Sequence, residues 1–159
     1  MRLLLVSVGR TKAGPERELI ERYLERAAAA GRGVGLNVEH REIEESRARR
    51  PQDRKREEAK AIRAVLGTAG RSIACDESGK SLTTAEFAAE LGRNRDQGVA
   101  QVGLIVGGPD GLDPDFRAEA NLVLAFGAMT WPHQLVRVMA AEQIYRALTI
   151  LAGHPYHRV

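Results

Sequence analysis

Three short apolar runs constrain most strongly what this chain can fold into. They read LLLV at residues 3–6, LIV at residues 104–106 and LVL at residues 122–124. A strand with one solvated face alternates apolar and polar residues, whereas a strand buried on both faces is continuously apolar. The runs therefore predict parallel strands that carry helices on both faces of one sheet.

Segments with helical signals separate these runs. Thr83 or Thr84 and the pair Asp113 and Pro114 suit helix starts, and Gly67 suits a helix end. Strands are expected near residues 2–8, 34–38, 71–75, 102–106 and 122–126, and helices near residues 15–30, up to 66, 84–94, 114–120 and 133–152. Strands and helices thus alternate about five times, which predicts an α/β fold with a mostly parallel sheet.

Length and composition narrow the class of protein. The chain has 159 residues, so we expect a single domain over residues 1–159. Its N-terminal apolar run is too short to cross a bilayer, and no membrane partner is expected. The one cysteine, Cys75, excludes an internal disulfide and fits a reducing compartment, so we expect a cytoplasmic protein. A net charge of +3 permits an RNA partner, while 4% aromatic residues argue against a base-stacking platform.

Three segments follow predicted strands directly, at residues 75–80, 107–111 and 127–132. Ligands of α/β folds bind at the carboxyl ends of the strands, so these segments are the candidate ligand loops. The DESGK sequence at residues 76–80 predicts a turn. The GGPDG sequence at residues 107–111 lacks the Lys-Ser/Thr of a P-loop and the spacing of a dinucleotide fingerprint. It indicates either a backbone that approaches a ligand closely or a purely structural turn.

The third segment, FGAMTWPHQLVR, runs straight into the last predicted helix. Gly127 and Ala128 are small enough for close approach, and Pro132 suits the start of a helix. His133 and Arg137 stand four residues apart and share one helix face. The segment predicts either a ligand loop flanked by cationic side chains or an ordinary connection with a surface histidine and arginine.

Other site classes have weaker support. The histidines lack the spacing of a zinc site, so no metal is expected, and no serine stands in a nucleophile elbow. The charged segment at residues 40–60 suits either a solvated loop and helix face or an RNA-phosphate patch. The last helix is apolar nearly all round, which predicts a second packing partner besides its own sheet, such as another copy of the chain.

Several motifs together are more specific than any one of them. LIVGGPDGL, FGAMTWPHQLVRVMAAEQIYRA and GHPYHR, with the opening VSVGR and DESGK, closely resemble the RlmH family over the whole chain. These are small SPOUT-superfamily methyltransferases that modify N3 of a pseudouridine in 23S ribosomal RNA. The resemblance implies an α/β fold with a C-terminal trefoil knot, S-adenosylmethionine as cofactor, and a homodimer.

The resemblance also implies site residues. Cofactor-binding positions would be Cys75, Asp76, Gly108, Gly127, Ala128, Met129, Thr130, Trp131 and Pro132. Candidates for catalysis would be His133, Arg137, Tyr156, His157 and Arg158. The arginines would hold phosphates or stabilise a developing base anion, and Tyr156 or His157 would orient the base, from the same or the partner subunit. Ala125 and Gly127 stand where many members have serine, and Trp131 stands before Pro132. Hydroxyl contacts to the cofactor from those two positions would therefore be absent, while main-chain contacts would remain available.

A chain of 159 residues leaves no room for a separate RNA-binding domain. The expected target is therefore a preassembled ribosome or subunit rather than a short RNA. Two alternatives stay open: a SPOUT methyltransferase that acts on another RNA base, and a non-catalytic ribosome-binding module that kept the fold.

Overall fold

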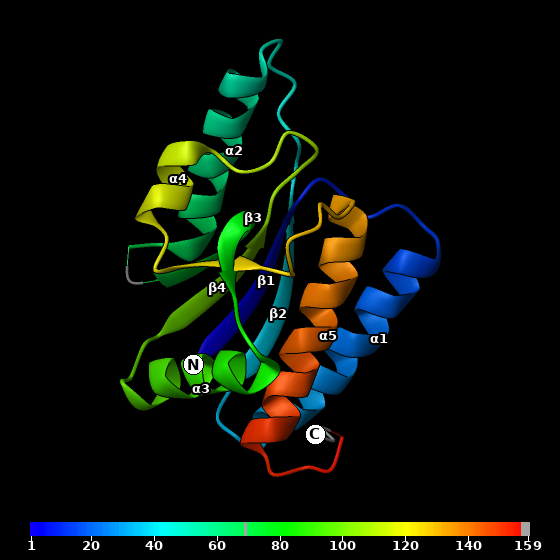
Figure 1. Cartoon of the computed structure of the whole chain (residues 1–159), viewed down its shortest axis with the longest axis vertical. Coiled ribbons are helices and arrows are strands. Elements are labelled where there is room, and N and C mark those ends of the chain that lie inside the picture. The colour runs from blue at the N-terminus through cyan, green and yellow to red at the C-terminus, as the bar shows by residue number, and fades with distance from the viewer. Residues whose placement is uncertain (69, 157–159) are drawn as a thin grey trace.

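A computed structural model describes residues 1–68 and 70–156 of the chain, drawn in Figure 1. The elements in chain order are β1 (Arg2–Val8), α1 (Pro15–Arg32), β2 (Asn37–Ile43), α2 (Pro51–Leu66), β3 (Gly70–Ser81), α3 (Thr84–Asp96), β4 (Gln101–Val106), α4 (Pro114–Glu119), β5 (Leu122–Ala125) and α5 (His133–Leu151). The five strands form one sheet in the order β2-β1-β4-β3-β5, and every neighbouring pair is parallel. The α/β fold with a parallel sheet predicted from the apolar runs is confirmed.

The sheet is buried on both faces, as the continuous apolar runs require. Along β1, Leu3 and Leu5 point into one apolar cluster, while Leu4 and Val6 point into the other. Helices α1, α3 and α5 cover the first face, and α2 and α4 cover the second (Figure 1). Each fully buried leucine stabilises the fold by about 1.5–3 kcal/mol relative to an exposed one. The molecule therefore has three layers, with the sheet in the middle.

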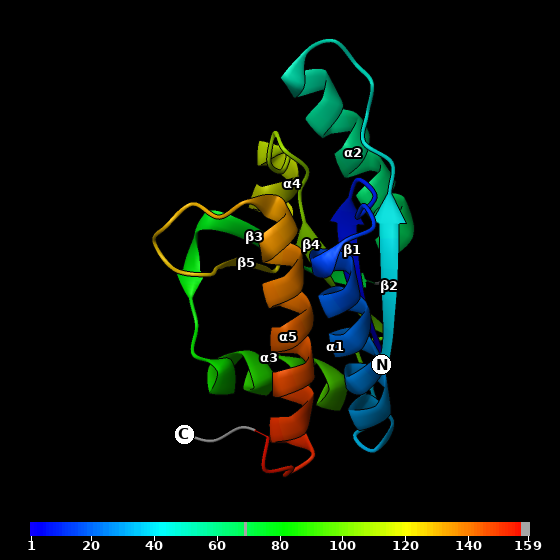
Figure 2. The same cartoon turned by 90° about the vertical axis from the view of Figure 1, so that its right-hand side faces the viewer.

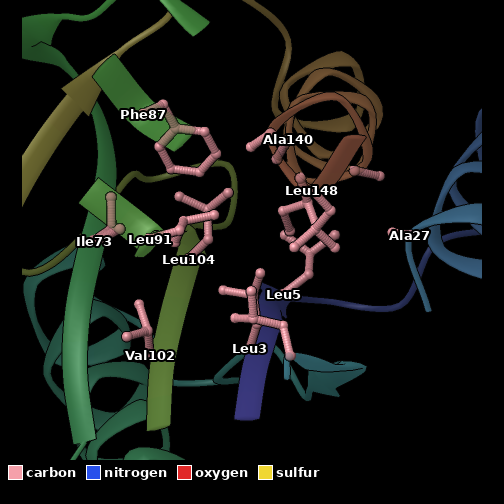
Figure 3. Packing of buried hydrophobic residues seen from close by; sticks show 14 of the residues in the cluster. Leu3, Leu5, Ala27, Ile73, Phe87, Leu91, Val102, Leu104, Ala140 and Leu148 are labelled. Atoms are coloured by element: carbon pink, nitrogen blue, oxygen red, sulfur yellow. The ribbon is translucent and has the colours of Figure 1, made fainter. Parts of the chain in front are cut away.

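Figure 3 shows the larger cluster from close by. Leu3 and Leu5 of β1 face Leu148 of α5, and Phe87 and Leu91 of α3 close over Leu104 of β4. The last helix thus lies in the middle of one face, beside α1 and α3, rather than at the edge of the fold.

Helix ends follow the signals in the sequence. The Thr83 hydroxyl accepts a hydrogen bond from the Glu86 amide at 3.2 Å, and the Glu86 carboxylate accepts one from the Thr83 amide at 2.7 Å. This reciprocal pair satisfies two amides that the first turn of α3 leaves free. Asp113 caps α4 in the same way, with bonds of 3.1 Å from the amides of Asp115 and Phe116. These predicted caps are confirmed.

The turn predicted at residues 76–80 is wrong, because this segment continues strand β3. Up to Cys75 the strand pairs with β4 and β5, and after a register shift Lys80 and Ser81 pair with β5 again. The strand predicted at residues 34–38 also begins later, at Asn37. The amides of Val34 and Leu36 bond instead to the Gly31 carbonyl, which closes the end of α1.

The far end of β3 crosses β5 at very short range. A Cβ atom placed on Gly79 would lie 2.7 Å from the carbonyl carbon and oxygen of Val123. Real Cβ atoms essentially never come so close to backbone, so only glycine fits here. Figure 2 shows the segment after β5 returning beside this end of β3 before α5 begins.

Helix α5 packs against α1, α3 and the sheet. Its buried face is built largely from small residues, among them Ala140, Ala141 and Ala147, which let α1 and α3 pack closely. Three large apolar side chains near its start are exposed: Met129 at 72%, Trp131 at 42% and Leu135 at 41%. In the described residues, no helix is both long enough and apolar enough to traverse a bilayer.

Candidate functional site at the carboxyl edge of the sheet

A cavity of about 640 Å³ opens at the carboxyl ends of the strands. Its volume lies within the range of small-molecule and cofactor sites, about 300–1,000 Å³. All three predicted ligand loops contribute to its lining, together with the start of α5. The structure therefore brings together three segments that are separate in the chain, at residues 75–78, 107–111 and 126–132.

The first wall is formed by Cys75 and Asp76 of β3. The Asp76 carboxylate accepts hydrogen bonds from the amide and hydroxyl of Ser78, at 3.0 and 2.5 Å, and pairs with Arg117 of α4 at 3.0 Å. Burial alone would raise the pKa of Asp76, but these bonds and the ion pair outweigh it and hold the pKa below its ordinary value. Asp76 is therefore a fixed negative charge at the cavity wall.

The Cys75 thiol has the opposite character. Burial, with the neighbouring Asp76 charge, raises the pKa of this thiol to about 12. The thiolate is the reactive form of cysteine, so Cys75 is an unreactive wall residue at neutral pH.

The second wall is a tight glycine turn. Gly108 and Gly111 form an isolated antiparallel bridge, and Gly111 has a φ of 79°, which favours glycine. A Cβ on Gly108 would lie 3.1 Å from Val8, so the main chain here packs directly on β1. The turn is fixed from outside by Arg54 of α2, whose guanidinium donates two hydrogen bonds to Asp110, at 2.6 and 3.0 Å.

The third wall is the loop between β5 and α5. Gly127 has a φ of 98°, and the Trp131 indole donates a hydrogen bond of 3.1 Å to the Phe126 carbonyl. The Thr130 hydroxyl donates one of 2.7 Å to Glu77, which ties this wall to the first. Of the six residues predicted to bind cofactor here, Gly127, Met129, Thr130, Trp131 and Pro132 line the cavity, whereas Ala128 does not.

His133 begins α5 and lines the cavity. Burial and the nearby Arg137 charge lower the pKa of His133 below its ordinary value. Because an unperturbed histidine titrates near pH 6.5, this imidazole is neutral at pH 7. A neutral ring nitrogen can accept a proton, so His133 is the titratable group at the cavity that suits a general base.

Arg137 is not among the residues that line the cavity. Its side chain is fully buried, and the guanidinium donates hydrogen bonds to the Val8 carbonyl and, at 3.0 Å, to the Thr11 hydroxyl. Nε has no partner within the described part of the chain. In this subunit Arg137 instead ties the start of α5 to the end of β1.

Tyr156 lies at the opposite end of α5 from the cavity. A helix of 19 residues is about 28 Å long, so this side chain does not reach the cavity of its own subunit. Its ring packs against Tyr145 in a tilted arrangement with centroids 4.5 Å apart, and its hydroxyl donates to Glu142 at 3.4 Å. His157 and Arg158, the remaining predicted catalytic residues, lie outside the described residues.

Three further charged residues lie at this site. Arg117 pairs with Asp76, Glu77 accepts from Thr130, and Lys55 stands at the rim. Glu77 falls within a predicted loop, and Lys55 within the charged segment at residues 40–60 that suited an RNA-phosphate patch. Arg117 belongs to a helix with no motif, so the sequence carried no signal for it. No group of three or more potential metal ligands occurs among the residues that the structure describes.

Comparisons with known proteins agree on one family. The family model described as predicted SPOUT methyltransferase matches residues 1–157. Ribosomal RNA large subunit methyltransferase H of Beijerinckia indica subsp. indica is 60% identical over 159 residues, covering 99% of each chain. The protein of the same name from Methylocella silvestris is 57% identical with the same coverage.

One solved structure was also similar in part. The SpoU methyltransferase AviRb from Streptomyces viridochromogenes, in complex with AdoMet, aligns with 92% of this chain and 59% of that chain. The identity is 14% and the TM-score 0.39, too low to carry an argument.

Proposed function

This chain belongs to the RlmH family of SPOUT methyltransferases, and we propose that it transfers the methyl group of S-adenosylmethionine to large-subunit ribosomal RNA. One observation carries the proposal: three strand-end segments from distant parts of the chain converge on a single cavity. The relatives' names supply the class of substrate, and the cavity supplies a place for the methyl donor.

The cavity fits S-adenosylmethionine in size and chemistry. Leu124, Phe126 and Val136 provide apolar surface for a base, and the glycine turn offers main-chain groups for polar contacts. The fixed carboxylate of Asp76 is suited to a cationic part of the ligand. Cys75 borders the same space as a neutral thiol and does not compete for the methyl group.

The bound donor would supply a methyl carbon already activated by a positively charged sulfur. The chain's own residues then have two tasks: to align the attacking nitrogen and to receive its proton. The loop at residues 126–132 and the glycine turn would position S-adenosylmethionine for the transfer. We assign proton acceptance to the neutral ring of His133, at the cavity edge. With the donor bound, His133 would accept the N–H proton of the attacking nitrogen as that nitrogen takes the methyl group, and the sulfur would keep the electrons of the carbon–sulfur bond.

We infer that the methylated atom is N3 of a pseudouridine, as the family resemblance implies. N3 carries a proton that must be removed during methylation, and the neutral ring of His133 is suited to accept it. The same resemblance supports a reaction on the assembled ribosome or its large subunit, in the cytoplasm.

We further infer a homodimer in which the tail of one subunit completes the cavity of the other. Tyr156, the last described residue, lies a helix length from the cavity of its own chain. Exposed Trp131 and Leu135 beside the cavity give a partner subunit apolar surface to cover. The resemblance implies the same assembly, with cationic groups delivered across the interface.

The family resemblance also implies a trefoil knot. We assign its crossing to the close passage of Gly79 over Val123, after which the chain turns back to form α5. A threaded segment holds the loop at residues 126–132 against β3, as the Thr130–Glu77 bond does locally.

Two measurements test the function. Calorimetry with S-adenosylmethionine should show one binding event per subunit. Ribosomes from a deletion strain, incubated with the protein and labelled donor, should gain one methyl group on a pseudouridine of 23S RNA, located by mass spectrometry. A short RNA hairpin is the control and should stay unmethylated.

The possible failures separate the alternatives. Absence of donor binding would favour a non-catalytic ribosome-binding module. Donor binding with methylation of transfer RNA, and none of ribosomal RNA, would assign the protein to another SPOUT activity.

A further inference from the structure

The loop between β2 and α2, residues 44–50, carries three cations beside the cavity. Arg47, Arg49 and Arg50 are exposed, and none has a carboxylate within 4.0 Å in the part of the chain that the structure describes. Figure 1 shows this loop and the start of α2 extending beyond the carboxyl edge of the sheet. We call residues 44–50 the arginine loop.

The arginine loop has a defined backbone, held from within. The Ser46 amide donates to the buried Glu58 carboxylate at 3.0 Å, and the Ser46 hydroxyl donates to Glu57. The Ala48 amide in turn donates to the Ser46 hydroxyl at 3.1 Å. The carboxylates of α2 are thus used to shape the loop, and they do not neutralise its arginines.

Arg54 fastens the arginine loop to the cavity. One guanidinium nitrogen donates to the carbonyls of Ala48 and Arg49, at 3.1 Å each, while the other two hold Asp110 of the glycine turn. The cations are therefore placed at a fixed position relative to the second cavity wall. Lys55, one residue further, lines the cavity itself and extends the positive charge to its rim.

The chemistry of the loop favours RNA among polyanionic partners. Its sequence, EESRARR, has no aromatic or large aliphatic residue that would anchor it in a membrane surface. Arginine forks match phosphate oxygens, and arginines that neutralise phosphates release the cations condensed around the RNA backbone. The nearby Asp53 lies in the first turn of α2, where a carboxylate complements the helix N-terminus.

We propose that the arginine loop binds backbone phosphates of the ribosomal RNA next to the target nucleotide and holds that strand over the cavity. This inference rests on the proposed function, since it assumes RNA at the cavity. It assigns to residues 44–50 a docking role distinct from the cofactor walls and from the tail. The side chains of Arg47, Arg49 and Arg50 make the contact, and Arg54 sets their position.

The test compares alanine variants of the three arginines, singly and together, with a control pair. The side chains can be removed safely, because the hydrogen bonds of the loop use its backbone, Ser46 and Arg54. Arg22→Ala with Arg32→Ala removes two exposed cations of α1 that also have no carboxylate within 4.0 Å among the described residues, and is matched to Arg49→Ala with Arg50→Ala. Affinity for large ribosomal subunits is measured against salt concentration, together with kcat/KM for methylation and donor affinity.

The triple variant should bind large ribosomal subunits about tenfold more weakly at physiological salt, and its affinity should depend less steeply on salt concentration. The kcat/KM should fall in parallel, while donor affinity and melting temperature stay unchanged. The control pair should retain wild-type values. Unchanged subunit affinity and salt dependence in the triple variant would overturn the proposal. The proposal would also be overturned if the triple variant bound anionic lipid vesicles more weakly but bound large ribosomal subunits as the wild type does. That result would point to a membrane.

Subunit binding is measured without donor, so it tests the loop even if no methylation occurs. Wild-type protein that binds subunits through the arginine loop but methylates nothing would contradict the proposed function alone.

Discussion

At the scale of single residues, the guanidinium of Arg137 joins three parts of the molecule. It belongs to α5, donates to the carbonyl that ends β1, and reaches Thr11 in the following loop. The Thr11 amide donates a hydrogen bond of 2.7 Å to the carboxylate of Glu42, near the C-terminal end of β2. A charged group this deeply buried is stable only while these partners remain, because a lost partner leaves an uncompensated polar group.

Replacing Arg137 with alanine should therefore destabilise the protein strongly. The Val8 carbonyl and Thr11 hydroxyl lose their donor, and a cavity replaces a fully buried side chain. We expect the free energy of unfolding to fall by about 2–4 kcal/mol, measured by urea denaturation. Arg56→Ala, at an exposed position of α2, should change it by less than about 0.5 kcal/mol. Equal effects of the two substitutions would mean that Arg137 is not buried in solution.

His40 of β2 makes stability depend on pH. Burial lowers the pKa of His40, and the Arg137 charge adds to this, while Glu42 and Glu21 act in the opposite direction. The unfolded chain therefore takes up the proton at a higher pH, near 6.5, than the folded chain does. The stability is fully present above pH 6.5 and is lost as the pH falls below it toward the folded pKa.

Urea unfolding at pH 7.5 and pH 5.5 measures this dependence. Wild type should lose stability at the lower pH, and His40→Gln should lose less. Some loss should persist in the variant, because the pKa of His133 is lowered as well. An identical loss in both proteins would rule out His40 as a contributor.

The sequence predicted residues well where the physics is local. The Asp113 cap and the Thr83 box need only neighbours within one helical turn, and both form. It predicted poorly where the partner is remote. The i and i+4 spacing of His133 and Arg137 placed both on one face, but burial of Arg137 depends on Val8, 129 residues away. The pairing of Asp76 with Arg117 is hidden for the same reason.

At the scale of elements, β3 and β5 cross where Gly79 leaves no room for a side chain. The crossing positions the loop at residues 126–132, which follows directly from β5. Alternating strands and helices fixed the order of the elements in advance, but DESGK gave no sign of a strand. Its pairing with β5 after a register shift is a tertiary effect that overrides turn composition.

Gly79→Ala should force the two strands apart. The new Cβ would meet the Val123 backbone at 2.7 Å, where no flexible side chain can yield. We expect a loss of roughly 2 kcal/mol or more in unfolding free energy, with weaker donor binding because the third wall shifts. Gly33→Ala is the matched control, since its φ is −68° and its nearest neighbour is 3.6 Å away. Comparable losses in the two variants would refute the crossing.

At the scale of the whole molecule, the single domain and the homodimer stay predictions. The two-sided apolar character of α5 was interpreted as a sign of a second copy, yet α1 and α3 account for most of the burial. What is left for a partner is the exposed surface around Met129, Trp131 and Leu135. The periodicity of apolar residues cannot distinguish packing within one chain from packing against a second copy, because both require apolar side chains.

Sedimentation should give a mass near twice 17.4 kDa for the wild type. Leu135→Glu places a charge on the exposed apolar surface and should shift the protein toward monomer. Gln52→Glu adds the same charge at an exposed position of α2 and should leave the dimer intact. A Leu135→Glu variant that stays dimeric would place the interface elsewhere.

Mixed dimers test whether the tail acts across the interface. His133→Ala disables a cavity and Arg158→Ala disables a tail, so neither homodimer should methylate ribosomes. Unfolding and refolding them together forms mixed dimers, each with one intact cavity and one intact tail. If the tail serves the partner's cavity, roughly a quarter of the wild-type activity should return. No recovery would mean that both residues act within one subunit.

The position of α5 between α1 and α3 has a consequence for how the protein is made. Synthesis proceeds from the N-terminus, and α1 is complete when only 32 residues exist. Helix α1 packs mainly against α5, and one edge of β1 pairs with β4, which is translated much later. In a nascent chain, the apolar face of α1 therefore stays exposed to water until almost the whole chain has been translated. Premature termination before residue 133 would release a product with no closed core, open to proteolysis.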